Sequence, residues 1–381
     1  MISKQNITLA LNMIVGPGEA KELKQCLESV VVPEFFDEII IVCTSKDKEV
    51  EAVAKEYTDN VLYFKWCDDF SKARNYAIEN TTSDYIMWLD ADDKIDKTSR
   101  SRLYRMKEYI SDANIDVFLL PYKLDLDASG NFNQVLPRER IFKNAERFRW
   151  RYKIHEQIST KNAEVASFKG ISIEHHSVKS GMEGLIRNVK ILKKAYAKNS
   201  NKHYMFYLAR DLAILKQYDV AIPLFENFIH TRVGGIGDLY CASLEVARYY
   251  TYNEDTSLKT ETINKGETYA RIAMSFSDLH AEPLVLLGDI YHFKGKIENA
   301  IKFYKLAMNK RLNGKTVQEK PFYEQIPSER LSQIYEESNL FDGLEQALFY
   351  NKLVLKHVAN KTILERRNRI LNRLIDTTTK L

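Results

Sequence analysis

The chain has 381 residues, which at roughly 150 residues per domain is enough for two or three domains. Its 56 Lys and Arg residues against 52 Asp and Glu residues leave a net charge of +4, too even a balance to indicate nucleic-acid binding. Hydrophobic residues make up 45% and charged residues 28%, as in ordinary globular proteins, which excludes a largely disordered chain.

No segment of the sequence has the pattern of a membrane span or a secretory signal. The longest apolar stretches, 38–43 and 117–121, are far shorter than the roughly 18 residues that a span requires. The first ten residues lack a cationic region followed by an apolar core. Four cysteines without CxxC spacing indicate reduced thiols in a cytoplasmic protein, with neither a zinc site nor a disulfide framework: Cys26, Cys43, Cys67 and Cys241.

The first part of the chain alternates between strand-like and helix-like segments. Apolar runs predict strands at 7–15, 38–44, 60–66 and 84–89, and amphipathic spacing predicts helices at 21–30, 47–57 and 69–81. Such alternation indicates a parallel, doubly wound sheet. Ligands of these sheets bind beyond the carboxyl ends of the strands, so the residues just after each strand are the candidates for a site.

From 117 to 178 the pattern becomes extended. We expect strands at 117–126 and 132–142, joined by a polar turn at 127–131, and further extended segments at 148–160 and 171–178. Residues 1–180 are therefore predicted to form one mixed α/β domain with an antiparallel finish.

Residues 181–381 are predicted to be helical. One segment has the spacing of small and large residues that is typical of a tetratricopeptide (TPR) repeat: Leu287, Gly288, Tyr291, Gly295, Ala300, Tyr304 and Ala307. Looser copies of the spacing recur in the rest of this part. The pattern favours an α-helical solenoid of three to four helix pairs, and an irregular helical bundle is the alternative.

An acidic cluster follows the strand expected at 84–89. Asp90 and Asp92 are separated by one residue, so on an extended backbone their carboxylates point the same way, and Asp93 follows at once. Such carboxylates can hold a divalent cation while leaving positions open for a diphosphate. The alternative is a solvated acidic loop that caps a helix beginning near Lys97.

Several motifs in order give the chain a specific resemblance. The run WCDDFSKARN at 66–75, then WLDADD at 88–93, FRWRYKIHE at 148–156 and IEH at 173–175, resembles family-2 glycosyltransferases of the GT-A fold. The resemblance extends into the helical repeats. The most similar members carry TPR-like repeats and include enzymes that glycosylate cysteine or serine of bacteriocin precursor peptides.

The resemblance implies a role for each matching residue. Asp92 and His175 would bind Mn²⁺ or Mg²⁺, and Asp90 would contact the ribose or a metal-bound water. Asp69 and Arg74 occupy positions that contact uracil and ribose, although Arg74 could instead form an ion pair with Asp69 or Asp90 that braces the start of a helix. The loops that line the nucleotide pocket contain three further candidates: Glu19, Thr44 and Asp47.

By the same resemblance, the catalytic base is expected at Glu156, with His155 as the alternative base or as a group that orients the diphosphate. Either residue could instead only pair with Arg149 or Arg151. Both residue types can take a proton from an acceptor during an inverting transfer. The extended pattern at 148–160 predicts that the two side chains point to opposite faces, so only a bulge or turn would bring both into one site.

These motifs predict a metal-dependent, inverting glycosyltransferase that uses a nucleotide-diphosphate sugar, UDP-linked by resemblance, and acts on a peptide or protein side chain. One alternative acceptor is a cell-surface glycan precursor. Another alternative is a non-catalytic TPR adaptor with a degenerate nucleotide-sugar domain, because the loops at 16–19 and 43–47 depart from the family pattern. The helical part would bind the acceptor or form a homodimer.

Overall fold

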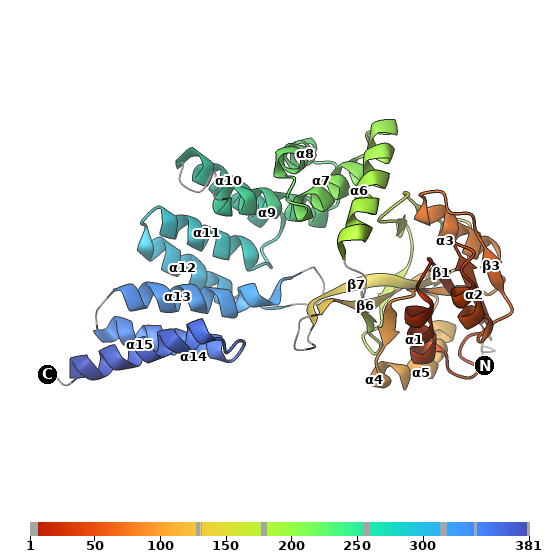
Figure 1. Cartoon of the computed structure of the whole chain (residues 1–381), viewed down its shortest axis with the longest axis horizontal. Helices are drawn as coiled ribbons and strands as arrows, with labels where there is room; N and C mark the ends of the chain where they lie inside the picture. The colour runs from red at the N-terminus through yellow and green to blue at the C-terminus, as the bar shows by residue number, and fades with distance from the viewer. Residues whose placement is uncertain are drawn as a thin grey trace. The chain divides into compact units, whose positions relative to one another are not determined.

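The computed structural model describes residues 7–126, 130, 132–176, 181–253, 260–312, 318–338 and 341–378 (Figure 1). Two compact units divide the chain, one up to Ser200 and the other from Asn201 onward. Helix α6 (Gly181–Lys198) belongs to the first unit, so the division falls after this helix, whereas the sequence pattern placed it at 180. Each unit has its own hydrophobic clusters.

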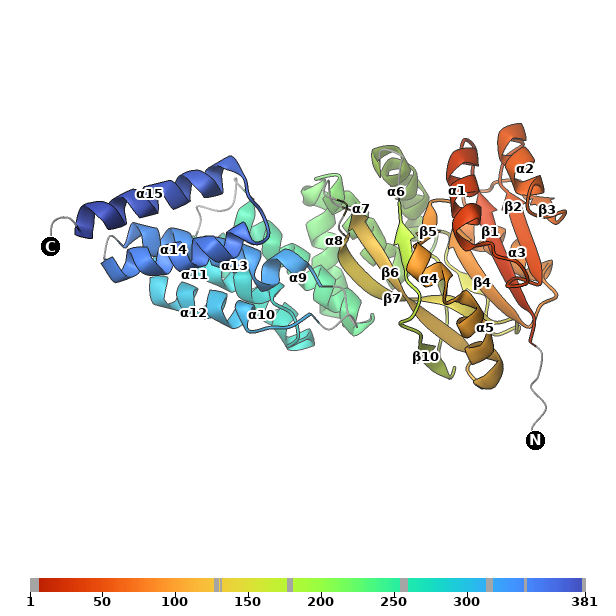
Figure 2. The same cartoon turned by 90° about the horizontal axis from the view of Figure 1, so that it is seen from below.

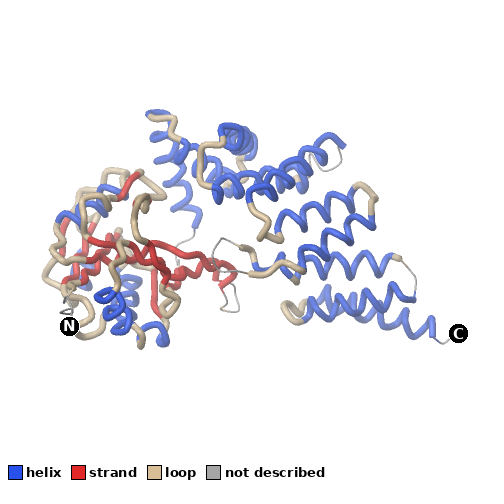
Figure 3. Tube along the Cα trace, turned by 180° about the vertical axis from the view of Figure 1, so that it is seen from behind, coloured by secondary structure: helices blue, strands red, loops and turns tan. Residues whose placement is uncertain are grey.

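The first unit contains all the strands of the described chain, drawn in red in Figure 3. Its strands are β1 (Leu9–Val15), β2 (Glu38–Cys43), β3 (Val61–Tyr63), β4 (Tyr85–Asp90), β5 (Asp93–Ile95), β6 (Val117–Leu126), β7 (Phe132–Lys143), β8 (Trp150–Arg151), β9 (Gln157–Ile158), β10 (Val165–Ser167) and β11 (Ile173–His175). Its helices before α6 are α1 (Ala20–Val30), α2 (Lys48–Lys55), α3 (Phe70–Glu79), α4 (Lys97–Arg100) and α5 (Leu103–Asp112).

The main sheet of this unit is mixed. Its strand order is β3-β2-β1-β4-β7-β6-β11-β5, with β10 beside β6. The first four strands are parallel, and β7 joins β4 in the antiparallel sense (Figure 2). Met13 and Val15 of β1 pack into one hydrophobic cluster and Ile14 into another, because successive strand residues point to opposite faces. The predicted doubly wound domain with an antiparallel finish is thus confirmed.

Four short strands differ from the sequence prediction. The segment 148–160, expected to be one extended run, consists of β8 and β9 joined by a bend. Strands β5 and β10 were not predicted, because three residues are too few for a periodic pattern. The expected turn at 127–131 lies mostly outside the described residues, as do 177 and 178 at the end of the expected strand 171–178.

The second unit is helical. Its helices are α7 (Lys202–Ile214), α8 (Tyr218–Thr231), α9 (Ile236–Tyr252), α10 (Thr260–Phe276), α11 (Glu282–Phe293), α12 (Ile297–Met308), α13 (Gln325–Glu337), α14 (Phe341–Leu355) and α15 (Lys361–Thr378), with a 3₁₀ turn η1 (Lys320–Tyr323). Consecutive helices pair from α7/α8 to α13/α14, and each pair packs on the next. This is the predicted solenoid of helix pairs, and the irregular bundle is excluded.

The TPR-like spacing has a visible packing reason in α11 and α12. A Cβ atom added to Gly288 would lie 2.4 Å from Cε1 of Tyr304, so only glycine lets the two helices approach this closely. Tyr304 is fully buried and donates its hydroxyl to Oδ1 of Asp289 at 2.6 Å. Across the described residues, every helix is too short or too polar to cross a membrane.

Candidate active site

The carboxyl end of β4 carries the acidic cluster. Asp90 is the last residue of β4 and Asp93 the first of β5, so Asp92 lies in the turn between them. The backbone N–H of Asp90 donates to Oδ2 of Asp93 at 3.0 Å and closes this turn. Because the backbone turns here, the carboxylates of Asp90 and Asp92 face different partners, contrary to the shared orientation expected of an extended Asp-x-Asp.

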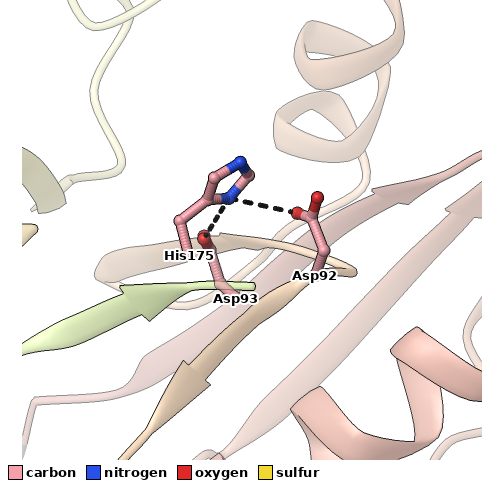
Figure 4. Close-up of side chains that lie close together, drawn as sticks. All are labelled: Asp92, Asp93 and His175. Carbon is pink, nitrogen blue, oxygen red and sulfur yellow. Dashed lines mark hydrogen bonds and ion pairs between the residues drawn. The ribbon is translucent and has the colours of Figure 1, made fainter. Parts of the chain in front are cut away.

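His175 reaches this turn from β11. Antiparallel pairing with β5 sets His175 opposite Asp93. Nδ1 of His175 lies 3.4 Å from Oδ1 of Asp92 and 3.4 Å from Oδ1 of Asp93 (Figure 4). The potential ligand atoms of the three residues all lie within 4.8 Å of one another. Two carboxylates and an imidazole are donors that suit a divalent cation, so the structure brings together the two residues expected to bind the metal.

The protonation of this cluster reflects its burial and crowding. Burial, followed by repulsion from Asp90 and Asp93, raises the pKa of Asp92 to about 6 against the opposing attraction of His175. Burial by itself lowers the pKa of His175, but its hydrogen bond with Asp93 and the charge of Asp92 outweigh burial and raise it. A divalent cation would relieve the repulsion among these carboxylates and displace protons from both groups.

Arg74 connects two other predicted site residues. Its Nη2 lies 2.6 Å from Oδ1 of Asp90 and its Nε lies 2.6 Å from Oε1 of Glu156. The guanidinium carbon lies 4.5 Å from the ring centroid of Trp88 and 5.1 Å from that of Trp150, which shields the buried cation from water. The predicted alternative, an ion pair with Asp90, is therefore present, and Arg74 also orients Glu156.

Glu156 and His155 lie in a turn between β8 and β9, and not on the expected strand. Tyr152 and His155 have φ angles of 71° and 52°, in the left-handed region that few non-glycine residues adopt. The bend turns the carboxylate of Glu156 toward Arg74. Because His155 and Glu156 do not lie on one strand, the predicted alternation of their side chains does not apply.

Two contacts anchor this turn to α3. The side-chain amide of Asn75 donates to the carbonyl oxygen of Trp150 at 3.0 Å and accepts from its N–H at 2.9 Å, as a neighbouring strand would. The backbone N–H of Phe70 donates to the carbonyl oxygen of Lys153 at 2.8 Å. The helix that carries Arg74 and the turn that carries Glu156 are therefore held together at both ends.

The predicted nucleotide-binding residues of the first two loops form hydrogen bonds with the backbone of these loops. Asp47 accepts backbone N–H groups from Gly18 at 2.8 Å and from the start of α2, and these bonds lower its pKa. The hydroxyl of Thr44 donates to the carbonyl oxygen of Val15 at 3.0 Å, and Glu19 accepts the N–H of Gly16 at 2.8 Å. These side chains therefore shape the loops that follow β1 and β2.

Asp69 is the residue before α3 and caps this helix. Its Oδ1 accepts the hydroxyl of Ser71 at 2.7 Å and the backbone N–H of Lys72 at 3.2 Å. Asp69 is largely buried, with 6% of its residue surface exposed, and its contact with the nucleotide stays a prediction.

Sequence reasoning missed two buried groups of the site. Asp93 was noted among the acidic residues but received no role, and Arg140 was not considered. Both side chains are buried, with 0% of Asp93 and 1% of Arg140 exposed. A charged residue directly before the apolar pair Ile141-Phe142 was a signal, because a buried arginine in a strand needs a partner.

Residues 18–165 match the sequence model of the family described as "Glycosyl transferase family 2". The match covers α1 to β9 and thus includes the acidic turn, Arg74 and Glu156. It agrees with the resemblance drawn from the motifs.

Two curated proteins are similar to parts of the chain. The SPbeta prophage-derived glycosyltransferase SunS of Bacillus subtilis is 26% identical over 229 residues, which are 57% of this chain and 52% of SunS. A TPR repeat-containing protein of Synechococcus elongatus is 41% identical over 87 residues, 23% of this chain and 21% of that protein. The chain therefore spans about half the length of SunS and about a fifth of the length of the TPR protein.

Among solved structures, residues 1–349 of S. aureus TarS align with 81% of this chain and 93% of that chain, at 14% identity and a TM-score of 0.37. A thermophilic TPR protein of Thermus thermophilus aligns with 51% of this chain and 94% of its own, at 16% identity and a TM-score of 0.33.

Proposed function

We propose, from the premise that residues 18–165 belong to glycosyl transferase family 2, that the chain transfers a sugar from a nucleotide-diphosphate donor to an acceptor. The observation that carries this proposal is the pair of carboxylate clusters at the carboxyl end of β4. One is the Asp92–Asp93–His175 group, and the other is Arg74 with Asp90 and Glu156. A domain that only binds a nucleotide has no need for both.

The cation is proposed to be Mn²⁺, held by Asp92 and His175. Mg²⁺ prefers oxygen ligands in a strict octahedron, so an imidazole among the donors favours the manganese ion. When bound, the cation would neutralise charge on the donor diphosphate as the sugar leaves. Asp90 lies outside this donor group, because its carboxylate is committed to Arg74.

Glu156 is proposed as the base for an inverting transfer. Its side chain is 11% exposed and its carboxylate is oriented by Arg74, so it is already in a fixed position. His155 remains the alternative. The demand on the base depends on the acceptor, because a thiol with a pKa of about 8.5 gives up its proton far more readily than a hydroxyl.

The donor is proposed to be UDP-linked and the acceptor to be a peptide or protein side chain. Stacked helix pairs offer an extended surface of the kind that binds peptides, which supports acceptor binding by the second unit. Two alternatives remain for the test. The second unit could form a homodimer, and the acceptor could be a glycan precursor.

The first experiment is a screen of sugar-nucleotide hydrolysis with Mn²⁺, using UDP-glucose, UDP-galactose, UDP-GlcNAc, UDP-GalNAc and GDP-mannose. Release of UDP from one donor by the wild type, lost in Asp92→Ala, is the expected result. Release that persists in Asp92→Ala would contradict the assignment of the cation site.

The second experiment distinguishes the two candidate bases once an acceptor is known. Glu156→Gln should lower kcat at least a hundredfold, whereas His155→Asn should retain most activity, because asparagine tolerates the left-handed backbone at this position. The opposite result would assign the base to His155.

An adaptor with an inactive domain is the rival function. It is favoured by the loops after β1 and β2, because Thr44 and Asp47 of the second loop hydrogen-bond to the backbone of Val15 and Gly18. Calorimetry with UDP, with and without Mn²⁺, separates the two functions: metal-dependent UDP binding is expected of the enzyme and not of the adaptor.

A further inference from the structure

Arg140 is a buried cation at an irregular point of β7. The pairing of β6 with β7 runs from Phe118 opposite Ile141 directly to Leu119 opposite Glu139, so Arg140 is the extra residue of a β-bulge. Bulges occur next to active sites, where they redirect one side chain. The side chain redirected here has 1% of its surface exposed.

The guanidinium of Arg140 lies between two aromatic rings. Its central carbon is 3.9 Å from the ring centroid of Trp88 on β4 and 4.2 Å from that of Tyr122 on β6, the two strands that flank β7. Its Nη1 donates to Oδ2 of Asp93 at 2.9 Å. Within the described residues, Nε and Nη2 have no hydrogen-bond partner, which makes this burial costly.

Within the described residues, the hydrogen bonds of Asp93 connect two buried side chains to the turn and the imidazole of the cluster. Oδ2 accepts from Arg140 and from the backbone N–H of Asp90, and so closes the turn that carries Asp92. Oδ1 accepts the hydroxyl of Tyr122 at 3.0 Å and faces Nδ1 of His175. With 0% of its side chain exposed, Asp93 is oriented by protein donors on both oxygens.

The geometry points to Arg140 and Asp93 as positioning residues that preorganise Asp92 and His175 for a divalent cation without binding it themselves. The inference rests on the cation of the proposed function. Arg140 compensates the charge of Asp93, and Asp93 orients the turn and the imidazole. The more exposed Asp92 and His175 are then available to bind the ion. Outer-shell partners of this kind change metal affinity by about tenfold to a hundredfold.

The test measures Mn²⁺ binding to the full-length chain without any sugar nucleotide. Electron paramagnetic resonance of the free ion monitors the binding. Arg140→Met should weaken Mn²⁺ binding at least tenfold. The double variant Arg140→Met/Asp93→Asn removes both buried charges together, which often leaves folding intact, and it should show the same loss with a melting temperature near that of the wild type. Lys143→Met, at the last residue of the same strand and paired with Asp116, is the matched control and should bind Mn²⁺ normally.

Wild-type Mn²⁺ affinity in the folded double variant would overturn the inference. So would a wild type that binds no Mn²⁺. Failure of the proposed function has a different signature, because the wild type would then bind Mn²⁺ and yet transfer no sugar.

Discussion

At the scale of single residues, Arg74 determines the electrostatics of the site. Burial tends to raise the pKa of Asp90, but the charge of Arg74 outweighs it and holds this pKa at about 2. Arg74 and Glu156 are nearly inaccessible, with 7% and 11% of their side chains exposed, while Asp90 is 34% exposed. One arginine thus neutralises two carboxylates that belong to different strands or turns.

Arg74→Ala should therefore lower the free energy of unfolding by about 3 kcal/mol at pH 7, because it leaves two carboxylates without their cation. The loss should shrink as pH falls. The folded pKa of Asp90 is below the ordinary value of about 3.9, so its contribution is complete above pH 4 and disappears as pH falls toward 2. Urea denaturation of both proteins at pH 7 and pH 3 tests this, and an equal difference at both pH values would contradict it.

Asp92 makes cation binding depend on pH near neutrality. Its pKa of about 6 means that the carboxylate is largely ionised at pH 7 and largely protonated at pH 5. Below pH 6, Mn²⁺ affinity should fall at least tenfold per pH unit, because each ion must displace the proton of Asp92 and also that of His175, whose pKa is raised. Mn²⁺ should accordingly raise the melting temperature more at pH 7 than at pH 5. Asp92→Asn should abolish the Mn²⁺ effect at both pH values, and an effect independent of pH in the wild type would exclude Asp92 as a ligand.

At the scale of elements, α11 and α12 can approach each other closely because Gly288 has no side chain. Gly288→Ala would place a methyl group 2.4 Å from the buried ring of Tyr304. We expect a loss of about 1–3 kcal/mol in unfolding free energy from overpacking, although alanine favours the helix more than glycine does.

The matched control is Gly184→Ala in α6, where a new Cβ would meet no atom within 4 Å. This substitution should stabilise the protein by up to about 1 kcal/mol. Thermal denaturation of both variants measures the contrast, and stabilisation by Gly288→Ala would mean that the two helices separate without penalty.

At the scale of the whole molecule, each of the two units contains hydrophobic clusters of its own. The clusters of the sheet domain contain residues between Leu9 and Ile173, and those of the helical part contain residues between Tyr240 and Ile370. Residues 1–200 and 201–381, produced separately, should therefore each unfold cooperatively, and the first should retain the Mn²⁺ affinity of the full chain. Circular dichroism and Mn²⁺ titration test this, and a fragment without cooperative unfolding would show that its core needs the other half.

The sequence by itself determined the elements whose signal is local. Continuous apolar runs located β1, β2 and β4, TPR spacing located the α11/α12 pair, and Asp-x-Asp marked the end of a strand where parallel sheets place ligands. Local signals suffice for these features because periodicity and backbone sterics act over a few residues.

Only the tertiary structure decided which side chains meet. The pairing of β11 with β5 puts His175 beside Asp92, a bulge in β7 sends Arg140 to Asp93, and a turn with a left-handed backbone directs Glu156 to Arg74. These contacts join residues far apart in the chain. They depend on strand register and on a single bulge, and a shift of one residue in either would reverse the face to which each side chain points.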